Sequence, residues 1–426
     1  MMMSALCLMH FALFSQAQNL QQGDHWLYCH MSDCGEWTAY AVSRDGLHYE
    51  DILNGLPIFN TDKVAGIEGG TRDAYITRRH DGSGFLMVTT DMCVARSHKW
   101  DNYGINLLTS DDLIHWQSTT FDFRKGPGIF CDPQSENCYK DFSAVHRVWA
   151  PQIFWNPDYR WSDGKRGGYL IYYSMLNDAE DHYDRMYYSY ADESFTRLTK
   201  PCLLFDWGYA TIDADINYLE SDHLYHMLIK KESGHPGIYT ATAPSLTGPW
   251  SEPVEDDYVS FEGTKKCEGS SAFQIPGEEG WRVAYIQYSD RPKHYRICRA
   301  DSHLRNFSDP HDIEGVNGPQ HGSFMRITRE EYDRLKAWSD SLMEHPRCVP
   351  VSVENPSGMM QTKNIEVSLQ EVRKQLDVSR IEPLVVCDEK GNHIDFQQTP
   401  EGLLRFEVNL PPRTNASYFI LRNFGI

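Results

Sequence analysis

A polar phrase that recurs at the ends of predicted strands limits the possible folds more than any other feature of this chain. It occurs as AVSRDGLHYE (41–50), LLTSDDLIHWQ (107–117), YSYADESFTRL (188–198), TATAPSLTGPWSEP (240–253) and CRADSHLRNFSDP (298–310). Each copy has a small residue, a polar turn and a central apolar or glycine position, and most copies have an aromatic residue shortly afterwards. Runs such as GFLMVTT and GGYLIYYSM between the copies predict many short antiparallel strands.

Five copies at intervals of roughly 50–80 residues indicate a repeat architecture. Units of four strands build a β-propeller, and about 60 residues per unit leave room for four strands. A two-sheet sandwich would also have many short strands, but it gives no reason for the phrase to recur. We therefore predict an all-β fold with a five-bladed β-propeller over 18–340.

The remainder of the chain alternates like strands again. RITREEYDRLKAWSD, around 326–338, predicts a short helix after the propeller. NIEVSLQEV, EPLVVCDEKGNHIDF and GLLRFEVNL follow it, with Gly-Asn and Pro-Pro turns between strand-like runs. We predict a small β-sandwich-like domain over 345–426.

The first residues predict export. An apolar stretch from about Ala5 to Phe14 precedes Ser15-Gln16-Ala17, a small-x-small cleavage signal, although Lys and Arg are absent before it. We expect a signal peptide over 1–17 and a protein that is periplasmic or secreted. No later apolar run is long enough to span a bilayer, so no membrane insertion is expected. The formal net charge of −20 disfavours nucleic acid and anionic membranes as partners, and a neutral ligand fits best.

Cysteine usage is compatible with export. Of the 11 cysteines, ten follow Cys7. The pairs Cys29/Cys34 and Cys131/Cys138 are close enough for short-loop disulfides, but sequence does not determine connectivity, and buried free thiols are an equal alternative. No Cys/His cluster has the spacing of a zinc site.

Three acids stand at the entry to apolar strand-like runs, flanked by small residues. They are Asp73 in GGTRDAYITRR, Asp213 in ATIDADINYL and Glu268 in CEGSSAFQI. Any one alone is more often a turn or capping acid, but acids at corresponding positions of different blades converge on a propeller axis. Glycoside hydrolysis needs one carboxylate that activates water and one carboxyl that protonates the leaving oxygen. A third acid can tune the pKa of the second.

In these stretches the chain resembles glycoside hydrolase family 43, a family of inverting five-bladed β-propeller enzymes. The matching stretches are RDAYI, RVWAPQIFWNPD (147–158), TIDADI, EGSSAFQI, GIYTATAPSLTGPW and GPQHGSFMRITREEYDRL, in this order from about residue 40 to 335. The resemblance implies that Asp73 is the general base, Glu268 the general acid and Asp213 the acid that modulates the pKa of Glu268.

Two features depart from the family pattern. Ala74 follows the base where many relatives have proline, and FEG at 261–263 makes Glu262 the alternative general acid. Asp215 is the alternative to Asp213, and we otherwise expect it to contact substrate.

The resemblance also implies roles for residues near the acids. Trp149 in VWAPQ resembles a residue that lines a sugar subsite, with a buried core tryptophan as an equal alternative. Arg72, beside the base, is expected to contact substrate, although it could form an ordinary surface ion pair. His321 in QHGS resembles the axial histidine that holds a water or calcium ion in some relatives; it could equally be a core residue. No cofactor is required, and a calcium ion on the propeller axis remains possible.

These features predict an exported, inverting, exo-acting glycoside hydrolase. It would release a terminal sugar, with α-L-arabinofuranose as the first expectation, from a neutral plant-type polysaccharide or oligosaccharide. The inserts at 124–143 and 156–168 are expected to wall the site and favour exo action. A β-xylosidase or β-galactosidase of the same family and a non-catalytic carbohydrate-binding propeller are the alternatives. A phosphorylase would need a cluster of basic residues around the funnel, and the sequence shows no such cluster near the acids.

Overall fold

The computed structural model describes residues 23–131, 138–177, 182–235, 237–253, 257–261 and 266–424. The predicted signal peptide, 1–17, and the alternative acid Glu262 lie outside these ranges. No helix in the described part of the chain is long and apolar enough to cross a membrane.

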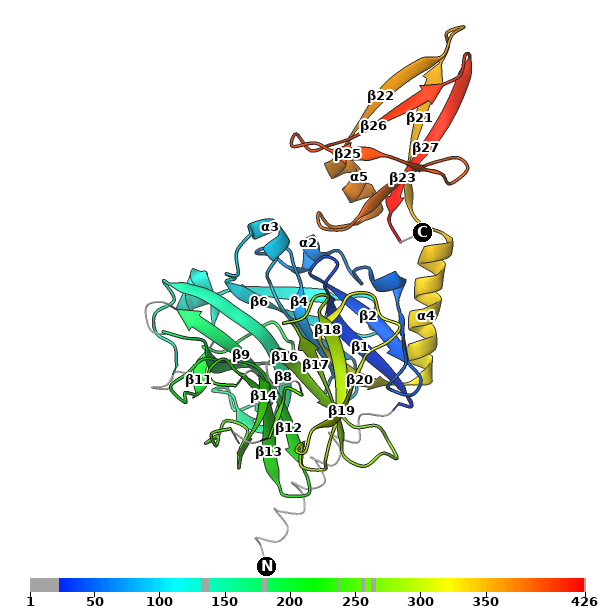
Figure 1. Ribbon diagram of the computed structural model, residues 1–426. Coiled ribbons are helices and arrows are strands. Elements are labelled where there is room, and N and C mark those ends of the chain that lie inside the picture. Colours follow the sequence, from blue (N-terminus) through cyan, green and yellow to red (C-terminus); the bar gives the residue numbers. More distant parts are fainter. Residues whose placement is uncertain are drawn as a thin grey trace, which may run out of the picture.

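Five four-stranded antiparallel sheets make up most of the chain (Figure 1). Their first strands are β4 (Arg72–Arg78), β8 (Val145–Arg160), β12 (Thr211–Leu219), β16 (Cys267–Phe273) and β20 (Pro319–Ile327). After β4 come β5 (Phe85–Thr90), β6 (Gly104–Ser110) and β7 (Gln117–Asp122); after β8 come β9 (Arg166–Asn177), β10 (Arg185–Ala191) and β11 (Cys202–Phe205). After β12 come β13 (Leu224–Lys231), β14 (Gly237–Ala243) and β15 (Tyr258–Val259); after β16 come β17 (Trp281–Gln287), β18 (His294–Ala300) and β19 (Ser308–Asp312).

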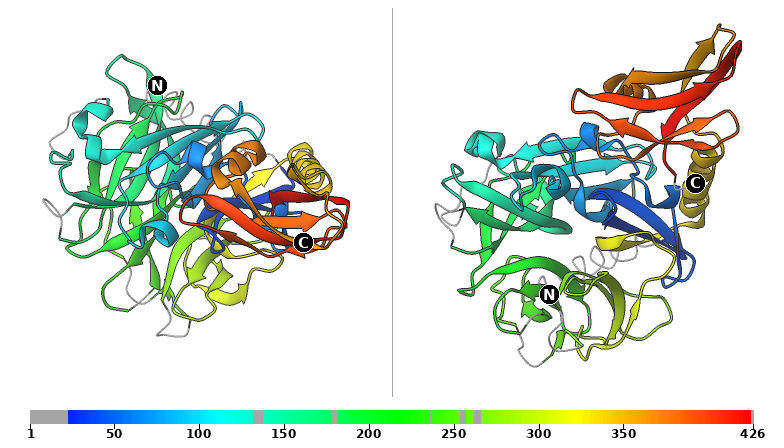
Figure 2. Two further views of the ribbon diagram at one scale, coloured as in Figure 1. Left: turned by 90° about the horizontal axis from the view of Figure 1, so that it is seen from above. Right: turned by 45° about the horizontal axis from the view of Figure 1, so that its top comes forward.

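The fifth sheet joins the two ends of this region. Its order is β20, β1 (His25–Ser32), β2 (Trp37–Ser43) and β3 (Tyr49–Asp51), so residues after 319 complete a sheet that begins at residue 25. The five first strands contact one another in a closed ring, β4 to β8, β12, β16, β20 and back to β4. Figure 2 shows the sheets following one another around the molecule in sequence order. The predicted all-β class is confirmed.

Apolar residues on both faces of the central strands explain why the sheets stack. Every residue of β2 (WTAYAVS) and of β5 (FLMVTT) is buried, as expected of strands covered on both sides. One buried cluster joins two neighbouring sheets, with Val88 of β5 and Leu107 of β6 on one side and Ile171 of β9 on the other. The cores therefore lie between successive sheets.

Short helices and 3-10 turns occupy the connections. They are η1 (Leu53–Gly55), α2 (Thr61–Val64), α3 (Val94–Ser97), η2 (Phe123–Lys125) and η3 (Pro127–Ile129). The helix predicted at 326–338 is α4 (Arg329–Glu344), because β20 continues to Ile327 and Thr328 forms a capping box with Glu331.

Residues 348–422 form two further sheets that share one apolar core, beside α4 in Figure 1. The first has the order β21 (Cys348–Asn355), β27 (Thr414–Arg422), β23 (Leu384–Asp388) and β24 (His393–Ile394); the second has the order β22 (Gln361–Ser368), β26 (Leu403–Leu410) and β25 (Phe396–Gln398). NIEVSLQEV is strand only in its first half. Ser368 caps helix α5 (Leu369–Leu376) by accepting a hydrogen bond from the Glu371 N–H.

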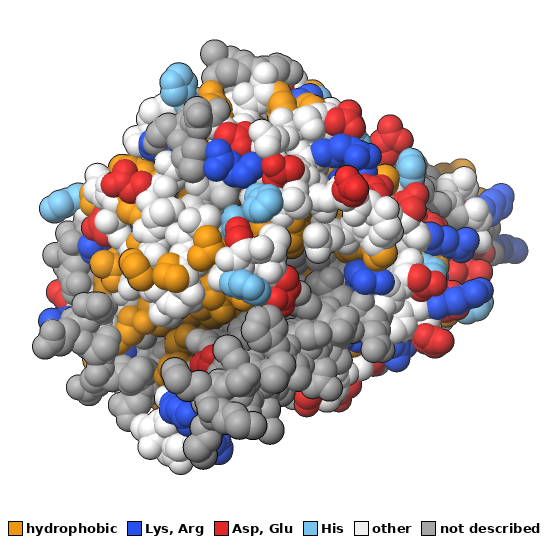
Figure 3. Space-filling model, turned by 90° about the horizontal axis from the view of Figure 1, so that it is seen from below, with side chains coloured by type: hydrophobic (Ala, Val, Ile, Leu, Met, Phe, Trp, Pro, Cys, Tyr) orange, Lys and Arg blue, Asp and Glu red, His pale blue; other side chains and the backbone are white. Residues whose placement is uncertain are grey.

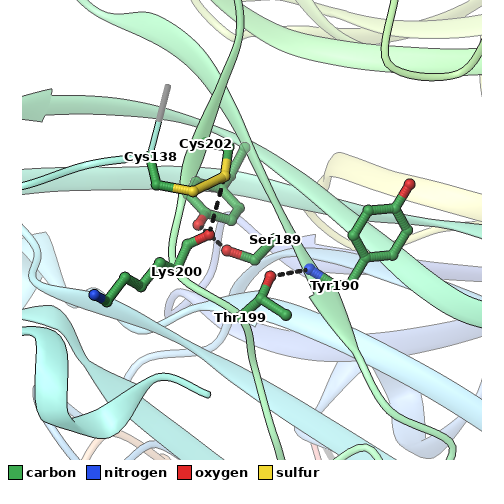
Figure 4. The surroundings of a disulfide bond; sticks show 7 residues. Cys138, Ser189, Tyr190, Thr199, Lys200 and Cys202 are labelled. Atoms are coloured by element: carbon green, nitrogen blue, oxygen red, sulfur yellow. Dashed lines mark hydrogen bonds between the residues drawn. A yellow bond between two sulfur atoms is a disulfide. The ribbon is translucent and has the colours of Figure 1, made fainter. Parts of the chain in front are cut away.

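The described disulfide differs from the short-loop pairs considered above. Cys138 is bonded to Cys202, 64 residues away, while Cys29, Cys34 and Cys131 are free thiols (Figure 4). The bond joins the segment before β8 to β11, the last strand of the same sheet. Neither short-loop pair is formed, and the alternative of free thiols holds for Cys29, Cys34 and Cys131. Cys138 instead meets Cys202, because the outer strand β11 returns to the insert at 124–143.

The two inserts lie at opposite ends of their sheets. The insert at 124–143 follows the end of β7, where Asp122 pairs with Gly104. This is the same edge of the sheet as the start of β4, where Asp73 lies. The insert at 156–168 is the β8–β9 hairpin, at the other end of β8 from Trp149. The expectation that 156–168 walls the site is thus wrong.

Charged side chains of both signs are visible among the described residues on the surface seen from below (Figure 3). In Figure 3 the basic side chains on this face are scattered among acidic ones.

The contact between sheets predicts a large cost for one core substitution. Ile171 is fully buried in the cluster shared by two sheets. We expect Ile171→Ala to lower the free energy of unfolding by about 2–5 kcal/mol, because the lost methylenes leave a cavity. Urea unfolding followed by tryptophan fluorescence measures this. Met359→Ala, at a position that is 75% exposed, is the control and should change the midpoint little. Equal midpoints for both variants would contradict the packing described here.

Candidate active site

Each of the five first strands carries a one-residue bulge close to its beginning. In β4, Asp73 and Ala74 stand opposite a single residue of β5, and the same two-against-one pattern recurs in the other four first strands. The first bulge residue has left-handed φ in four strands: Asp73 (53°), Ala150 (49°), Asp213 (55°) and Gly269 (66°). The repeated bulge places selected side chains at one end of the ring of strands.

The bulges correct one expectation about the acids. Asp73 and Asp213 occupy corresponding positions of β4 and β12, as predicted, and both positions are the first residue of the bulge. Glu268 stands one residue earlier in its strand, before Gly269. It corresponds in position to Arg72 of β4 and Trp149 of β8.

His321 of β20 lies between the two aspartates. Its Nδ1 is 3.4 Å from Asp73 Oδ1 and 3.9 Å from Asp213 Oδ2. The Gly269 N–H donates to Asp213 Oδ2 at 3.1 Å. A Cβ atom on Gly269 would lie 2.8 Å from the imidazole Cγ, so only glycine lets β16 approach the ring this closely.

The charges in this group push the pKa values apart. Burial raises the pKa of Asp73. A hydrogen bond with His321 and the positive charges of His321 and Arg72 outweigh burial, so the pKa of Asp73 lies below its usual value. For His321, burial lowers the pKa, and the two aspartates outweigh it and raise the pKa to about 9. Burial raises the pKa of Asp213, and the Asp73 charge adds to this, while the His321 charge opposes it. At neutral pH Asp73 is an anion beside an imidazolium.

Glu268 is the most open of the three acids, with 31% of its side chain exposed, against 11% for Asp73. Burial and the neighbouring Asp213 raise the pKa of Glu268 to about 7, against the opposing effect of Lys230 and His321. The site therefore holds one carboxylate and one carboxyl that is protonated in part of the molecules near neutral pH. This is the division of roles that acid–base catalysis by two carboxyls needs.

Lys230 of β13 was missed by the sequence reasoning. Its side chain is 2% exposed, and Nζ lies 2.9 Å from the Tyr288 hydroxyl, 3.1 Å from Glu232 Oε1 and 3.6 Å from Glu268 Oε2. Burial lowers the pKa of Lys230, but the negative charges of Glu268 and Glu232 outweigh burial and raise this pKa above its usual value. The amine is therefore a cation. Lys230 thus adds one basic residue beside the acids, in addition to Arg72 next to Asp73. The available signal was that the strand following Asp213 ends in two lysines, IKK.

The predicted substrate-contacting residues have partners within the chain. Arg72 Nη1 lies 2.5 Å from Glu36 Oε1, and both side chains are 12% exposed, so this pair is partly buried rather than an ordinary surface pair. Trp149 is half-buried, with the Arg147 guanidinium 4.6 Å from its ring centroid. Their contact with substrate stays a prediction.

Asp215 is buried in the described structure. Its Oδ2 accepts hydrogen bonds from the Ala272 N–H at 2.8 Å and from the Asn217 amide at 2.9 Å. The carboxylate therefore ties β12 to β16, and substrate contact by Asp215 stays a prediction.

Metal binding by His321 also stays a prediction. Within the described ranges no group of three His, Cys, Asp or Glu side chains has an arrangement that could hold a metal ion. The Nδ1 atom of His321 faces two carboxylates.

Comparisons with known proteins give a family match over most of the chain. The family described as a probable glycosyl hydrolase domain, related to glycoside hydrolase family 43, matches residues 26–333. An α-L-arabinofuranosidase of Bifidobacterium longum is 22% identical over 229 residues, which cover 49% of this chain and 19% of that protein. The matched region thus spans about a fifth of the length of this curated relative.

Solved structures give weaker likenesses. An exo-β-1,3-galactanase from Phanerochaete chrysosporium with β-1,3-galactotriose is 10% identical, with a TM-score of 0.47. The match covers 94% of this chain and 90% of the galactanase chain. A family 43 arabinoxylan arabinofuranohydrolase from Bacillus subtilis in complex with cellotetraose is 13% identical, with the same coverage and a TM-score of 0.44.

The contact between Lys230 and Glu268 predicts a shift in pH dependence. Removing the cation in Lys230→Met should raise the pKa of Glu268, because the carboxylate form loses a favourable charge. If Glu268 is the general acid, as the sequence predicts, activity falls with rising pH as it loses its proton, and the alkaline limb of kcat/KM should move up by about 1 pH unit. The measurement is kcat/KM against pH for a glycoside that the wild type hydrolyses.

Two controls accompany this test. Lys230→Arg keeps the positive charge and should leave the limb nearer its original position. Lys231→Met removes the neighbouring lysine and should leave the limb unchanged. An unshifted alkaline limb in a folded Lys230→Met protein would contradict the charge contact.

Proposed function

The chain belongs to the family of probable glycosyl hydrolase domains related to glycoside hydrolase family 43, and from this we propose a specific activity for it. It is an inverting, exo-acting hydrolase that releases a terminal α-L-arabinofuranose from plant polysaccharide or its oligosaccharides. One observation carries the proposal: a site with Asp73 held as a carboxylate and Glu268 with a pKa of about 7. The match to an α-L-arabinofuranosidase supports the choice of sugar.

The proposed reaction is a single displacement. Asp73 takes a proton from a water molecule, and the water oxygen bonds to the anomeric carbon. The bond from that carbon to the leaving oxygen breaks, and Glu268 gives its proton to that oxygen. Asp213 keeps the pKa of Glu268 high, and the His321 imidazolium keeps Asp73 ionised. An inverting site needs roughly 6.5–9.5 Å between base and acid carboxyls, to hold the water behind the anomeric carbon.

We propose a five-bladed β-propeller as the scaffold of this site. The closed ring of first strands and the pairing of β20 with β1 support five blades over 18–340, with a separate small β-sandwich-like domain over 345–426. Export to the periplasm or the medium is proposed from residues 5–17 alone. A mature protein that begins after Ala17 in N-terminal sequencing would support export, and an uncleaved chain would contradict it.

The alternatives differ in sugar or in chemistry. A β-xylosidase or β-galactosidase would use the same acids on another sugar, and a panel of nitrophenyl glycosides separates these activities. A non-catalytic binding protein would need no division of protonation between Asp73 and Glu268. A phosphorylase gains little support from the basic residues found, because Lys230 is held by Glu232 and Glu268, and Arg72 by Glu36.

Glu268→Gln tests the general acid. A sugar leaving group needs a proton, whereas a nitrophenolate hardly does. We expect the variant to lose activity on arabinose-substituted oligosaccharides by about 100-fold or more, and to keep much more on nitrophenyl α-L-arabinofuranoside. Glu279→Gln, an exposed glutamate beyond the same strand, is the matched control. Equal losses on both substrates would remove Glu268 from the acid role and direct attention to Glu262.

Asp73→Asn tests the general base. The amide has nearly the same shape but cannot take a proton from water, so both substrate types should lose turnover alike. Steady-state kinetics with circular dichroism as the folding control measure this. Near-normal kcat in the folded variant would exclude Asp73 as the base.

A further inference from the structure

We propose that Trp100 is a binding platform for a pyranose ring of the leaving chain, at the rim of the active site. This inference rests on the proposed function, because it assumes that a terminal sugar occupies the site. The observations behind it are the exposure of Trp100, its two ring contacts and the way its loop is held.

Trp100 is unusually exposed for its residue type. Its relative exposure is 57%, and among the described residues the other exposed large apolar side chains are Phe261, Met359 and Met360. An indole normally buries most of its apolar surface, and at 57% exposure Trp100 leaves a flat apolar surface in solvent that a ligand could cover. Trp100 is therefore the first tryptophan to consider for contact with a flat ligand.

The contacts of Trp100 place it beside the proposed catalytic residues. The Arg72 guanidinium lies 5.2 Å from its ring centroid, and Arg72 directly precedes Asp73. The ring of Trp149 lies 6.5 Å away at an interplanar angle of 71°, an edge-to-face contact. Trp100 thus extends the wall made by Arg72 and Trp149 outward to the solvent.

The loop that carries Trp100 is fixed before and after it. Glu36, which pairs with Arg72, also accepts hydrogen bonds from the Val94 and Ala95 N–H groups at 3.0 and 2.6 Å. Two residues after Trp100, the Asn102 side chain accepts from the Val148 N–H and donates to the Val148 carbonyl, each at 2.8 Å. The loop is therefore anchored on both sides of Trp100, to Glu36 and to β8, which reduces the backbone entropy lost when a ligand stacks on the indole.

The shape and chemistry of this surface fit a sugar ring. The CH face of a pyranose packs on an indole, and one face of Trp100 already lies against the Arg72 guanidinium. The exposed surface is then mainly the opposite face. An exo-acting enzyme keeps the terminal sugar innermost, so a platform at the solvent side meets the rest of the chain, which is the leaving group.

Trp100→Ala tests the platform by comparing two substrates. For an arabinose-substituted xylo-oligosaccharide we expect KM to rise about 10-fold with kcat changed less than about twofold, because ground-state and transition-state binding are lost alike. α-L-Arabinofuranosyl fluoride releases a fluoride ion, which is too small to stack on the indole, so its kinetics should stay close to wild type. Trp100→Phe keeps an aromatic face and should recover most of the affinity. Trp161→Ala, in the β8–β9 hairpin at the far end of β8, is the matched control and should leave both substrates unaffected.

A readout without catalysis separates this inference from the proposed function. Native gels containing arabinoxylan, arabinan or arabinogalactan should retard the wild type and Trp161→Ala with at least one polysaccharide, and retard Trp100→Ala less. If the wild type hydrolyses no arabinofuranoside but is still retarded through Trp100, the proposed activity fails and the platform stands. Unchanged KM and unchanged retardation in Trp100→Ala would overturn the platform, and so would equal losses on both substrates.

Discussion

The positive charge of His321 between two buried aspartates is the interaction on which the rest of the site depends. Asp73 and Asp213 would repel each other without it, and burial would raise the pKa of both. With it, the pKa of Asp73 falls below its usual value, while Asp213 remains close enough to raise that of Glu268. The imidazolium therefore links the state of the proposed base to that of the proposed acid.

This arrangement requires backbone that the sheets supply. Asp73 and Asp213 have left-handed φ at equivalent bulges, a conformation uncommon for residues other than glycine, asparagine and aspartate. Gly269 at the corresponding position lets the third strand approach His321. Because β20 pairs with β1, the strand with His321 comes from the end of the ring and still lies next to β4. The pairing of β20 with β1 therefore both closes the ring of sheets and brings His321 next to Asp73.

Sequence reasoning found the acids that occur at the same place in repeated units. It missed the features that depend on which strands pair with each other. Asp73 and Asp213 were recognisable because each stands at the start of an apolar run, and the two occupy equivalent positions of β4 and β12. The one-residue offset of Glu268 could not be recognised in the sequence, because the position of a bulge becomes visible only when two strands are paired. Lys230 reaches Glu268 from a neighbouring sheet, and Cys138 finds its partner 64 residues away. The IKK run marks Lys230 as a candidate, but which residue such a side chain contacts becomes visible only when the strands are placed side by side.

The central claim is that Asp73 activates water directly while Glu268 protonates the leaving group, in one displacement. Proton NMR during the first turnovers of the best nitrophenyl glycoside, before the released sugar mutarotates, tests it most directly. The account predicts that the first sugar released has the anomeric configuration opposite to that of the substrate. A first product with the substrate's own configuration would mean a covalent glycosyl-enzyme, and would contradict the assignment of Asp73 as base.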